Sequence, residues 1–269
     1  MLCNFNYDGY THKTDYEGRR LFTPEILIFP TSIEVDTCAA SIVAEQICRK
    51  PNSVFTLPTG STPQKMYEIL VQIHKKQALD MSNIIIFNLD EYWPIRRDHL
   101  SSYARYMRDR FISHINIHHS NWHIPNGEAI DPHEEAKRYE ICMRQNGPVD
   151  LAVLGIGPGK TCHIGFNEKG STFGSRVRYA MLDEETQKVN RNSFEQPEEM
   201  PHGAITQGVA TILEADKIIL IAKGEGKAWG IHRTLKGPIR SEAPSSFLRL
   251  HQKVVFILDQ NAGRLLLQD

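Results

Sequence analysis

Short apolar segments alternate along this chain with longer segments of helical periodicity, and this alternation constrains the fold more than any other feature. The apolar segments cover residues 25–29, 53–57, 84–89, 150–154, 217–222 and 253–258. The helical segments cover residues 34–49, 63–76, 101–115, 132–146, 206–214 and 226–235. Several strands are apolar at nearly every position, as strands buried on both faces are. The pattern therefore predicts an α/β fold with a mainly parallel, Rossmann-like sheet and helices on both of its faces.

The length of the chain, 269 residues, fits one large α/β domain or two small ones. The sequence has no internal repeat, no low-complexity segment and no long linker. We therefore expect a single domain over residues 25–269, preceded by an N-terminal extension at residues 1–24.

Charge and cysteine content argue against several classes of protein. The formal net charge is −1, so electrostatics give no reason to expect nucleic acid or an anionic membrane as a partner. No apolar run approaches the roughly 18–20 residues of a membrane helix, and residues 1–20 lack the apolar core of a signal peptide. The cysteines are odd in number and have no paired spacing, so we expect a cytoplasmic protein without a disulfide framework. They are Cys3, Cys38, Cys48, Cys142 and Cys162.

The segment after the second predicted strand has the composition of an anion-binding turn. Ligands of open parallel sheets bind beyond the carboxyl ends of the strands. Gly60 can adopt a positive φ, and Pro63 suits the first position of the helix that follows. Ser61 and Thr62 place hydroxyl groups beside the unpaired N–H groups of the helix start, so the segment indicates a phosphate site. The alternative is a strand-to-helix turn without a ligand.

Two carboxylates, Asp90 and Glu91, directly follow the third predicted strand. A carboxylate at the end of a buried strand is costly unless it is paired or used. Partial burial would raise its pKa toward neutrality and make it a general base. The alternative is structural, because either residue could cap a helix or pair with Arg96 or Arg97.

The densest group of polar residues follows the fourth predicted strand, from Gly155 to Glu168. His163 can act as an acid or a base near neutral pH, and Glu168 could orient it or balance its charge.

Two other interpretations of this loop fail on spacing. Gly159-Lys160-Thr161 looks like the end of a nucleotide-binding P-loop, but that motif requires glycine at position 154, which is leucine. Cys162 beside His163 suggests a metal site or a thiol nucleophile, yet no second Cys/His pair has ligand spacing. We expect no metal, and we interpret Cys162 as a small buried thiol.

Lys227 follows the fifth predicted strand and stands at the start of another helix. A cation there opposes the helix dipole, and a bound anion would relieve the conflict. Lys227 is therefore a candidate phosphate ligand, and a solvated surface lysine is the alternative.

Together these segments resemble the glucosamine-6-phosphate deaminase/isomerase family over residues 33–259. The matching motifs are Leu57-Pro58-Thr59-Gly60-Ser61-Thr62-Pro63, Phe87-Asn88-Leu89-Asp90-Glu91-Tyr92, Ser102-Tyr103, Pro125-Asn126-Gly127, Gly155-Ile156-Gly157-Pro158, His163-Ile164-Gly165-Phe166-Asn167-Glu168, Gly170-Ser171 and Gly224 with Lys227-Ala228. The Asp-Glu-Tyr and Phe-Asn-Glu motifs are specific to this family. The related 6-phosphogluconolactonases differ after both the Asp-Glu pair and the loop histidine.

The resemblance implies a role for each matching residue. Asp90 would move a proton between C2 and C1 of the sugar, and His163, supported by Glu168, would open the pyranose ring through O5. The phosphate would be held by Gly60, Ser61, Thr62 and Lys227. The family reaction is an aldose–ketose isomerisation with loss of ammonia, and it needs no metal or redox cofactor.

Three positions depart from the family pattern. The family has Asp or Asn, then Gly, before the loop histidine, whereas Gly159, Lys160, Thr161 and Cys162 make this loop two residues longer and leave out the acid or amide. We expect weakened ring opening as a result. Lys160 either points inward, lowering the pKa of His163, or points to solvent. Arg191 lies one position before the family's arginine phosphate ligand, and Ala180 replaces a lysine of the regulatory site, so we expect no such regulation.

These observations predict an enzyme that acts on an amino-sugar 6-phosphate, either glucosamine or galactosamine 6-phosphate. A catalytically weakened sugar-phosphate sensor is the first alternative, although the roughly 24 residues before the first strand leave no room for a DNA-binding helix-turn-helix domain. A 6-phosphogluconolactonase-like hydrolase is the second. The sequence leaves open whether the chain forms a homo-oligomer.

Overall fold

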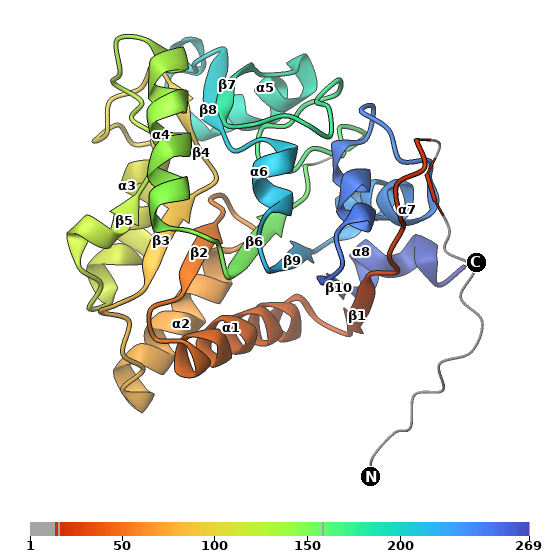
Figure 1. Ribbon diagram of the computed structural model, residues 1–269, viewed down its shortest axis with the longest axis horizontal. Coiled ribbons are helices and arrows are strands. Elements are labelled where there is room, and N and C mark those ends of the chain that lie inside the picture. The colour runs from red at the N-terminus through yellow and green to blue at the C-terminus, as the bar shows by residue number, and fades with distance from the viewer. Residues whose placement is uncertain (1–13, 16, 158, 269) are drawn as a thin grey trace.

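The computed structural model describes residues 14–15, 17–157 and 159–268. Its main layer is a seven-stranded sheet with the order β1-β10-β9-β6-β2-β3-β5. All neighbouring strands in it are parallel, so their carboxyl ends share one edge (Figure 1). The strands are β1 Glu25–Phe29, β2 Val54–Leu57, β3 Ile85–Asn88, β5 Trp122–His123, β6 Leu151–Gly155, β9 Lys217–Ala222 and β10 Val254–Asp259. The six predicted strands are confirmed, and β5 is a further, two-residue strand.

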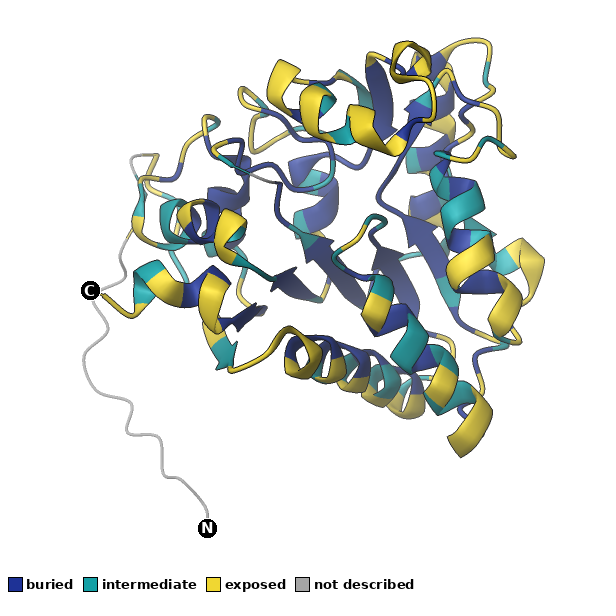
Figure 2. Ribbon diagram, turned by 180° about the vertical axis from the view of Figure 1, so that it is seen from behind, coloured by how far each residue is buried: buried dark blue, intermediate teal, exposed yellow. Residues whose placement is uncertain are grey.

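Helices cover both faces of this sheet, as predicted. They are α1 Ser32–Arg49, α2 Gln64–Gln77, α3 Tyr103–Arg110, α4 Pro132–Asn146, α5 Glu184–Asn190, α6 Val209–Leu213, α7 Ala228–Lys236 and α8 Gln260–Gly263. Short 3-10 helices are η1 Ile112–His114, η2 His119–Asn121, η3 Arg191–Ser193, η4 Pro197–Glu199, η5 Glu225–Lys227, η6 Pro244–Leu250 and η7 Arg264–Leu266. In Figure 2 the helices are buried on their inner sides and exposed on their outer sides.

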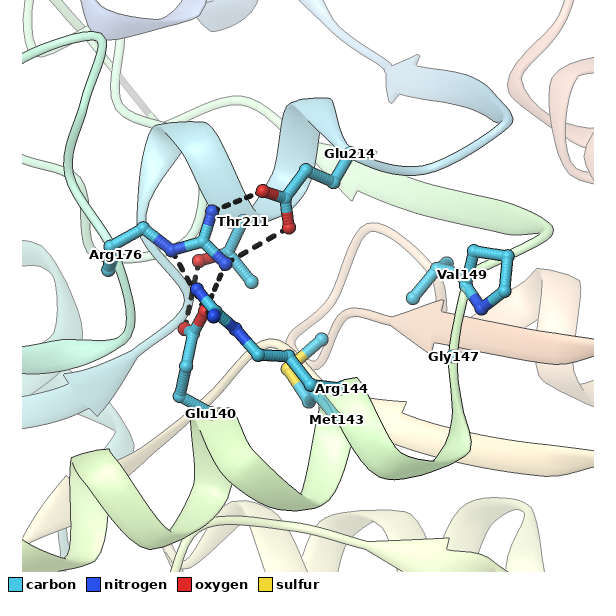
Figure 3. Close-up of a pocket in the computed structure, with 9 residues that line it drawn as sticks. Glu140, Met143, Arg144, Gly147, Val149, Arg176, Thr211 and Glu214 are labelled. Carbon is cyan, nitrogen blue, oxygen red and sulfur yellow. Dashed lines mark hydrogen bonds and ion pairs between the residues drawn. The ribbon is translucent and has the colours of Figure 1, made fainter.

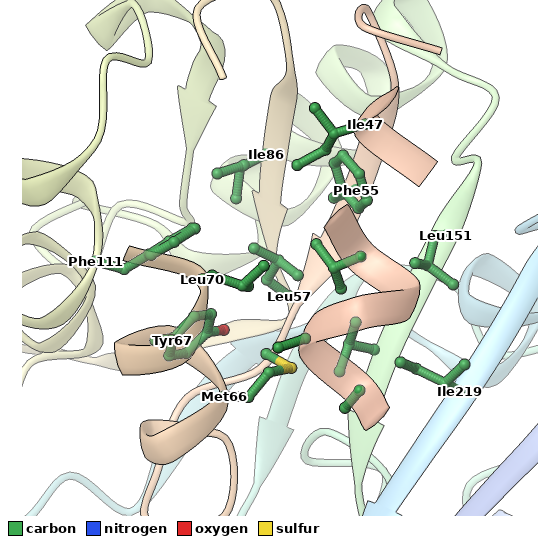
Figure 4. Close-up of a cluster of buried hydrophobic side chains, with 14 of the residues drawn as sticks. Ile47, Phe55, Leu57, Met66, Tyr67, Leu70, Ile86, Phe111, Leu151 and Ile219 are labelled. Atoms are coloured by element: carbon green, nitrogen blue, oxygen red, sulfur yellow. The ribbon is translucent and has the colours of Figure 1, made fainter. Parts of the chain in front are cut away.

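Two hydrophobic clusters, one on each face, explain why the strands are apolar throughout. Phe55 and Leu57 of β2 pack with Ile47 of α1 and Met66 of α2 on one face (Figure 4). Val54, the neighbour of Phe55 in the same strand, belongs to the opposite cluster, which includes side chains of α4, α6 and α7. Successive side chains of a strand point to opposite faces, so β2 contributes to both clusters.

Helix α1 begins with a capping box. The Thr31 hydroxyl accepts a hydrogen bond from the backbone of Glu34, and the Glu34 carboxylate accepts one from the Thr31 backbone at 2.9 Å. Such caps stabilise a helix by about 1 kcal/mol. They fix the start of the long helix that connects β1 to β2.

A second, three-stranded antiparallel sheet lies beyond the carboxyl edge of the first, and the sequence analysis missed it. Its order is β4-β8-β7, with bounds Asp90–Trp93, Gly203–Thr206 and Arg178–Met181. The predicted helix over residues 206–214 is therefore too long, because Thr206 ends β8 and α6 begins at Val209. The predicted helix over residues 101–115 is also too long, because α3 ends at Arg110.

The N-terminal segment forms a compact turn where it is described. Thr14 pairs with Arg20 in an antiparallel bridge, and the Asp15 carboxylate accepts hydrogen bonds from the backbone of Glu17 and Arg19. The Arg19 guanidinium lies 4.7 Å from the ring centroid of Phe173, in the loop after Glu168. The extension therefore packs against the folded domain.

Two expectations concern membranes and cysteines. Within the described ranges, no helix has the length and apolarity to cross a bilayer. The described cysteines, Cys38, Cys48, Cys142 and Cys162, are free, in agreement with the expectation of no disulfide framework, while Cys3 lies outside the described residues.

Candidate active site

The loops that carry the predicted site residues meet at the carboxyl edge of the main sheet. Strand β6 lies between β2 and β9, and β2 lies next to β3. The Gly60 turn follows β2, and Asp90 follows β3. The loop after β6 carries His163, and the segment after β9 carries Lys227. Parallel pairing therefore brings together segments that are far apart in the sequence.

Asp90 is the first residue of β4, two positions after the last residue of β3. It is only 5% exposed. Burial, together with the nearby charge of Glu91, raises the pKa of Asp90 to about 8. A carboxyl group whose pKa lies near neutrality is suited to proton abstraction from carbon. The structure thus gives Asp90 the environment that a general base needs.

Asp90 faces the histidine loop. Gly165 of that loop has φ +55°, and a Cβ atom built there would lie 3.4 Å from Asp90 Oδ2 and 3.0 Å from Thr206 Oγ1. The glycine therefore allows the loop backbone to approach the carboxyl group closely. Asp90 and the His163 loop belong to one site.

Glu91 has the structural role that the sequence analysis gave as the alternative. Its carboxylate accepts hydrogen bonds from the Ser102 hydroxyl at 2.8 Å, the Tyr103 N–H at 2.9 Å and the Ala104 N–H at 2.8 Å. These groups belong to the start of α3, so Glu91 caps that helix. The alternative of an ion pair between Glu91 and Arg96 is wrong, because the Arg96 guanidinium pairs with the Asp98 carboxylate at 2.9 Å.

His163 has two partners at the same ring nitrogen. Its Nδ1 lies 3.3 Å from Glu168 Oε2 and 3.4 Å from the hydroxyl oxygen of Thr186, a residue of α5. Burial alone would raise the pKa of Glu168, but His163, Thr186 and the backbone of Asp183 together hold that pKa below its ordinary value. A carboxylate at Nδ1 favours the tautomer that carries a proton there and leaves Nε2 to exchange a proton with a ligand.

In the lengthened part of the loop, only Lys160 is exposed. Lys160 is exposed, so the solvent-facing alternative is correct and the inward one is wrong. Gly159 and Cys162 both have positive φ, +61° and +49°, and these two bends form the bulge. Cys162 is buried, which confirms the interpretation of a small buried thiol, and burial raises the pKa of that thiol to about 11. Thr161 is also buried.

The Gly60 turn adopts the predicted conformation, with φ +96° at Gly60. Helix α2 begins at Gln64, one residue later than expected, because Pro63 occupies the N-cap position. Ser61 is exposed and Thr62 is partly buried. Their N–H groups thus stand at the start of a helix, where an anion would bind.

Lys227 is half-buried, so the solvated-surface alternative is wrong. Its ammonium group donates a hydrogen bond to the Ile156 carbonyl at 2.6 Å, and burial lowers its pKa to about 8. Strands β2 and β9 flank β6, so their ends are separated by about 10 Å, two strand spacings. A lysine side chain and a phosphate group can bridge such a gap.

Arg191 is exposed and belongs to η3. The neighbouring Ser193 carbonyl accepts a hydrogen bond from the Ser101 hydroxyl at 2.7 Å, which places η3 beside the start of α3. No contact of the described residues joins the Arg191 guanidinium to the Gly60 turn, so its role as a phosphate ligand stays a prediction.

The sequence analysis missed a buried network that fixes the histidine loop to the second sheet. Thr206 Oγ1 accepts a hydrogen bond from the Phe166 N–H at 3.0 Å, and the Asn167 amide donates to the Gln207 carbonyl at 2.8 Å. Arg178 of β7 donates to the Asn167 side-chain oxygen at 2.8 Å. The segments that form β7 and β8 are only four residues long and have no apolar run like those of the main sheet, so no sequence signal predicted this network.

A cavity of about 300 Å³ lies elsewhere, between α4, α6 and residues 147–149 (Figure 3). Arg176 forms ion pairs there with Glu140 and Glu214, and Glu140 also accepts a hydrogen bond from the Val177 N–H at 3.0 Å. None of the predicted site residues lines it. The ion pairs fix the approach to β7 and thereby support Arg178.

Comparison with known proteins places these features in a family context. A family model described as glucosamine-6-phosphate isomerases/6-phosphogluconolactonase matches residues 34–257. A glucosamine-6-phosphate deaminase of Thermoanaerobacter sp. (strain X514) is 42% identical over 242 residues, covering 90% of this chain and 95% of the relative. The deaminase of Rhodopirellula baltica is also 42% identical, covering 90% of this chain and 96% of its own length.

Comparison with solved structures shows the same resemblance. A monomeric glucosamine-6-phosphate deaminase superposes with a TM-score of 0.87 at 38% identity, covering 90% of this chain and 99% of that protein. The 6-phosphogluconolactonase of Trypanosoma brucei superposes with a TM-score of 0.70 at 20% identity, covering 91% and 99%. At that identity the second match shows the shared fold alone.

Proposed function

The chain belongs to the family of glucosamine-6-phosphate isomerases and 6-phosphogluconolactonases, and from this premise we propose that it converts glucosamine 6-phosphate and water into fructose 6-phosphate and ammonia. The observation that carries the proposal is the buried Asp90 carboxyl group facing the loop of the His163–Glu168 pair. The names of the relatives favour glucosamine over galactosamine, and their identity of about 40% favours a deaminase over a lactonase.

The first step is ring opening. His163 would take the proton of the C1 hydroxyl and deliver one to O5 as the C1–O5 bond breaks, which leaves an open-chain aldehyde. Glu168 at Nδ1 would balance the positive charge that the ring carries between the two transfers.

The second step is proton transfer on carbon. Asp90 would take the C2 proton and return it to C1, while the aldehyde oxygen gains a proton and the amino group loses one, which gives a ketose imine at C2 and a hydroxyl group at C1. Water then adds to C2 and ammonia leaves. The phosphate, held by the Gly60 turn and Lys227, would keep C1 and C2 in reach of the carboxyl group through these steps.

An ammonia-release assay on a panel of sugar phosphates tests the proposal. The panel contains glucosamine, galactosamine and N-acetylglucosamine 6-phosphates and 6-phosphogluconolactone. We expect ammonia from glucosamine 6-phosphate, and loss of that activity in Asp90→Asn. Lactone hydrolysis without ammonia release would refute the proposal, and tight binding without any turnover would support the sugar-phosphate sensor.

A further inference from the structure

Two tyrosine hydroxyl groups end on backbone carbonyls of the Gly60 turn. The Tyr67 hydroxyl donates to the Pro58 carbonyl at 2.5 Å, and the Tyr106 hydroxyl donates to the Gly60 carbonyl at 2.6 Å. Burial raises the pKa of both phenols, so both stay protonated donors. The two bonds hold one short stretch of backbone from two different helices, α2 and α3.

Fixing a carbonyl also fixes the N–H group of the next residue. A trans peptide is planar, and its C=O and N–H groups point in opposite directions. Tyr67 therefore sets the direction of the Thr59 N–H, and Tyr106 sets that of the Ser61 N–H. Neither N–H donates a hydrogen bond to another part of the described chain. Both are free to meet an anion on the side away from the tyrosines.

Both tyrosines are held firmly. Tyr67 is fully buried and stacks on Phe111, with ring centroids 4.8 Å apart. Tyr106 stands one turn into α3, and its N–H donates to the Ser102 carbonyl at 3.0 Å. Ser102 is the N-cap residue that the Glu91 carboxylate binds. The position of Tyr106 thus depends on Glu91, the neighbour of Asp90.

We propose that Tyr67 and Tyr106 are positioning residues of the phosphate site, which turn the N–H groups of Thr59 and Ser61 toward the bound phosphate. Glu91 acts with them, because it anchors the helix that carries Tyr106. Of the two adjacent carboxylates, Asp90 then acts as the base, and Glu91 helps to set the geometry of the phosphate site. This inference rests on the proposed function for the identity of the substrate, but the anion site can be tested without turnover.

Tyr106→Phe and Tyr67→Phe remove only the hydroxyl groups. A hydrogen bond contributes about 1 kcal/mol, so for each variant we expect about a 5-fold rise in KM for glucosamine 6-phosphate with kcat little changed. The dissociation constant of inorganic phosphate, measured by calorimetry, should rise by the same factor. A change in kcat alone, or no change in phosphate affinity, overturns the proposal.

Tyr139→Phe is the matched control. Its hydroxyl is equally buried and donates to the Asn88 carbonyl at 2.8 Å, at the end of β3 rather than in the Gly60 turn. It should lower the melting temperature without changing phosphate affinity, and an equal loss of phosphate affinity would refute the specific role. If Tyr67→Phe fails to fold, Tyr106→Phe decides. Wild-type protein that binds no phosphate refutes the inference, whereas phosphate binding with the expected shifts but without ammonia release refutes only the proposed reaction.

Discussion

The two halves of the proposed catalytic site, one around Asp90 and one around His163, are built in different ways. Asp90 is the first residue of a strand, buried between the two sheets and fixed by the pairing of β4 with β8. His163 stands in a loop whose preceding segment has positive φ at Gly159 and Cys162 and exposes Lys160 between these two bends. The half that we propose moves the proton on carbon is therefore part of the sheet architecture. The half that we propose opens the ring can change length without disturbing a strand, which explains why the departure from the family pattern falls there.

The largest effect should come from the sheet-bound half. Asp90→Asn keeps the shape and removes the base, so we expect turnover to fall by about 10²–10⁴-fold. The rate of ammonia release from glucosamine 6-phosphate measures this fall in turnover. Near-wild-type turnover would show that the buried carboxyl group is not the base and would end the contrast between the halves.

Asp90→Asn should also be more stable than the wild-type protein at alkaline pH. Burial raises the pKa of Asp90 from 3.8 to about 8. Between these values the folded protein keeps a proton that the unfolded chain has lost, so its free energy of unfolding falls as pH rises and levels off above about 8. Asn has no such proton. We expect Asp90→Asn to melt above wild type at pH 8, with a smaller difference at pH 5, and a constant difference would contradict the raised pKa.

A smaller effect is expected from the loop-bound half. Glu168→Gln removes the charge beside His163 Nδ1 while keeping the size, and such supporting contacts typically contribute about 10–100-fold. Turnover should fall by that factor, with KM nearly constant. A loss as large as that of Asp90→Asn would mean that both halves are equally rigid.

Shortening the loop should sharpen the comparison. Replacing Gly159–Cys162 by Asp-Gly restores the family length and its acid, and we expect turnover of the cyclic substrate to rise by about 10-fold, a typical order for one correctly placed partner. Lys160→Ala is the control, and it should change nothing because the side chain faces solvent. No gain in a variant that folds and binds phosphate would show that the longer loop opens the ring as well as the shorter one.

The smallest effect concerns the pH dependence of KM, which should follow the charge of Lys227, the proposed phosphate ligand. Burial lowers the pKa of Lys227 to about 8, so the free enzyme loses this charge above that pH. The protonated fraction falls about 10-fold between pH 7 and 9, and KM should rise by up to that factor. Arginine stays charged in this range, so Lys227→Arg should show a nearly constant KM from pH 7 to 9. Equal pH dependence in both proteins would exclude Lys227 from the phosphate site.

The sequence predicted six of the seven strands of the main sheet, because each of the six is a run of apolar residues that feeds two cores, whereas the two residues of β5 are too few to form such a run. It could not predict the second sheet, whose four-residue strands carry polar residues such as Asp90 and Arg178 and pair across long stretches of chain. Motif spacing identified Asp90, His163 and Glu168, and the structure brings them to one edge. The residues alone did not distinguish the roles of Asp90 and Glu91, since adjacent carboxylates look alike until the strand sends them to opposite sides; only the family resemblance assigned the proton transfer to Asp90.

The place of β10 in the sheet has a consequence for the order of assembly. It lies between β1 and β9, so the first strand to be synthesised has no partner until residues 254–259 have been made. Asp259, at its end, accepts hydrogen bonds from the Ser32 hydroxyl at 2.7 Å and from the Gly224 N–H at 3.0 Å. Gly224 leads into the turn with Lys227, so the lysine side of the proposed phosphate site is completed last. We expect a nascent chain that stops before β10 to hold the Asp90 strand but no fixed lysine.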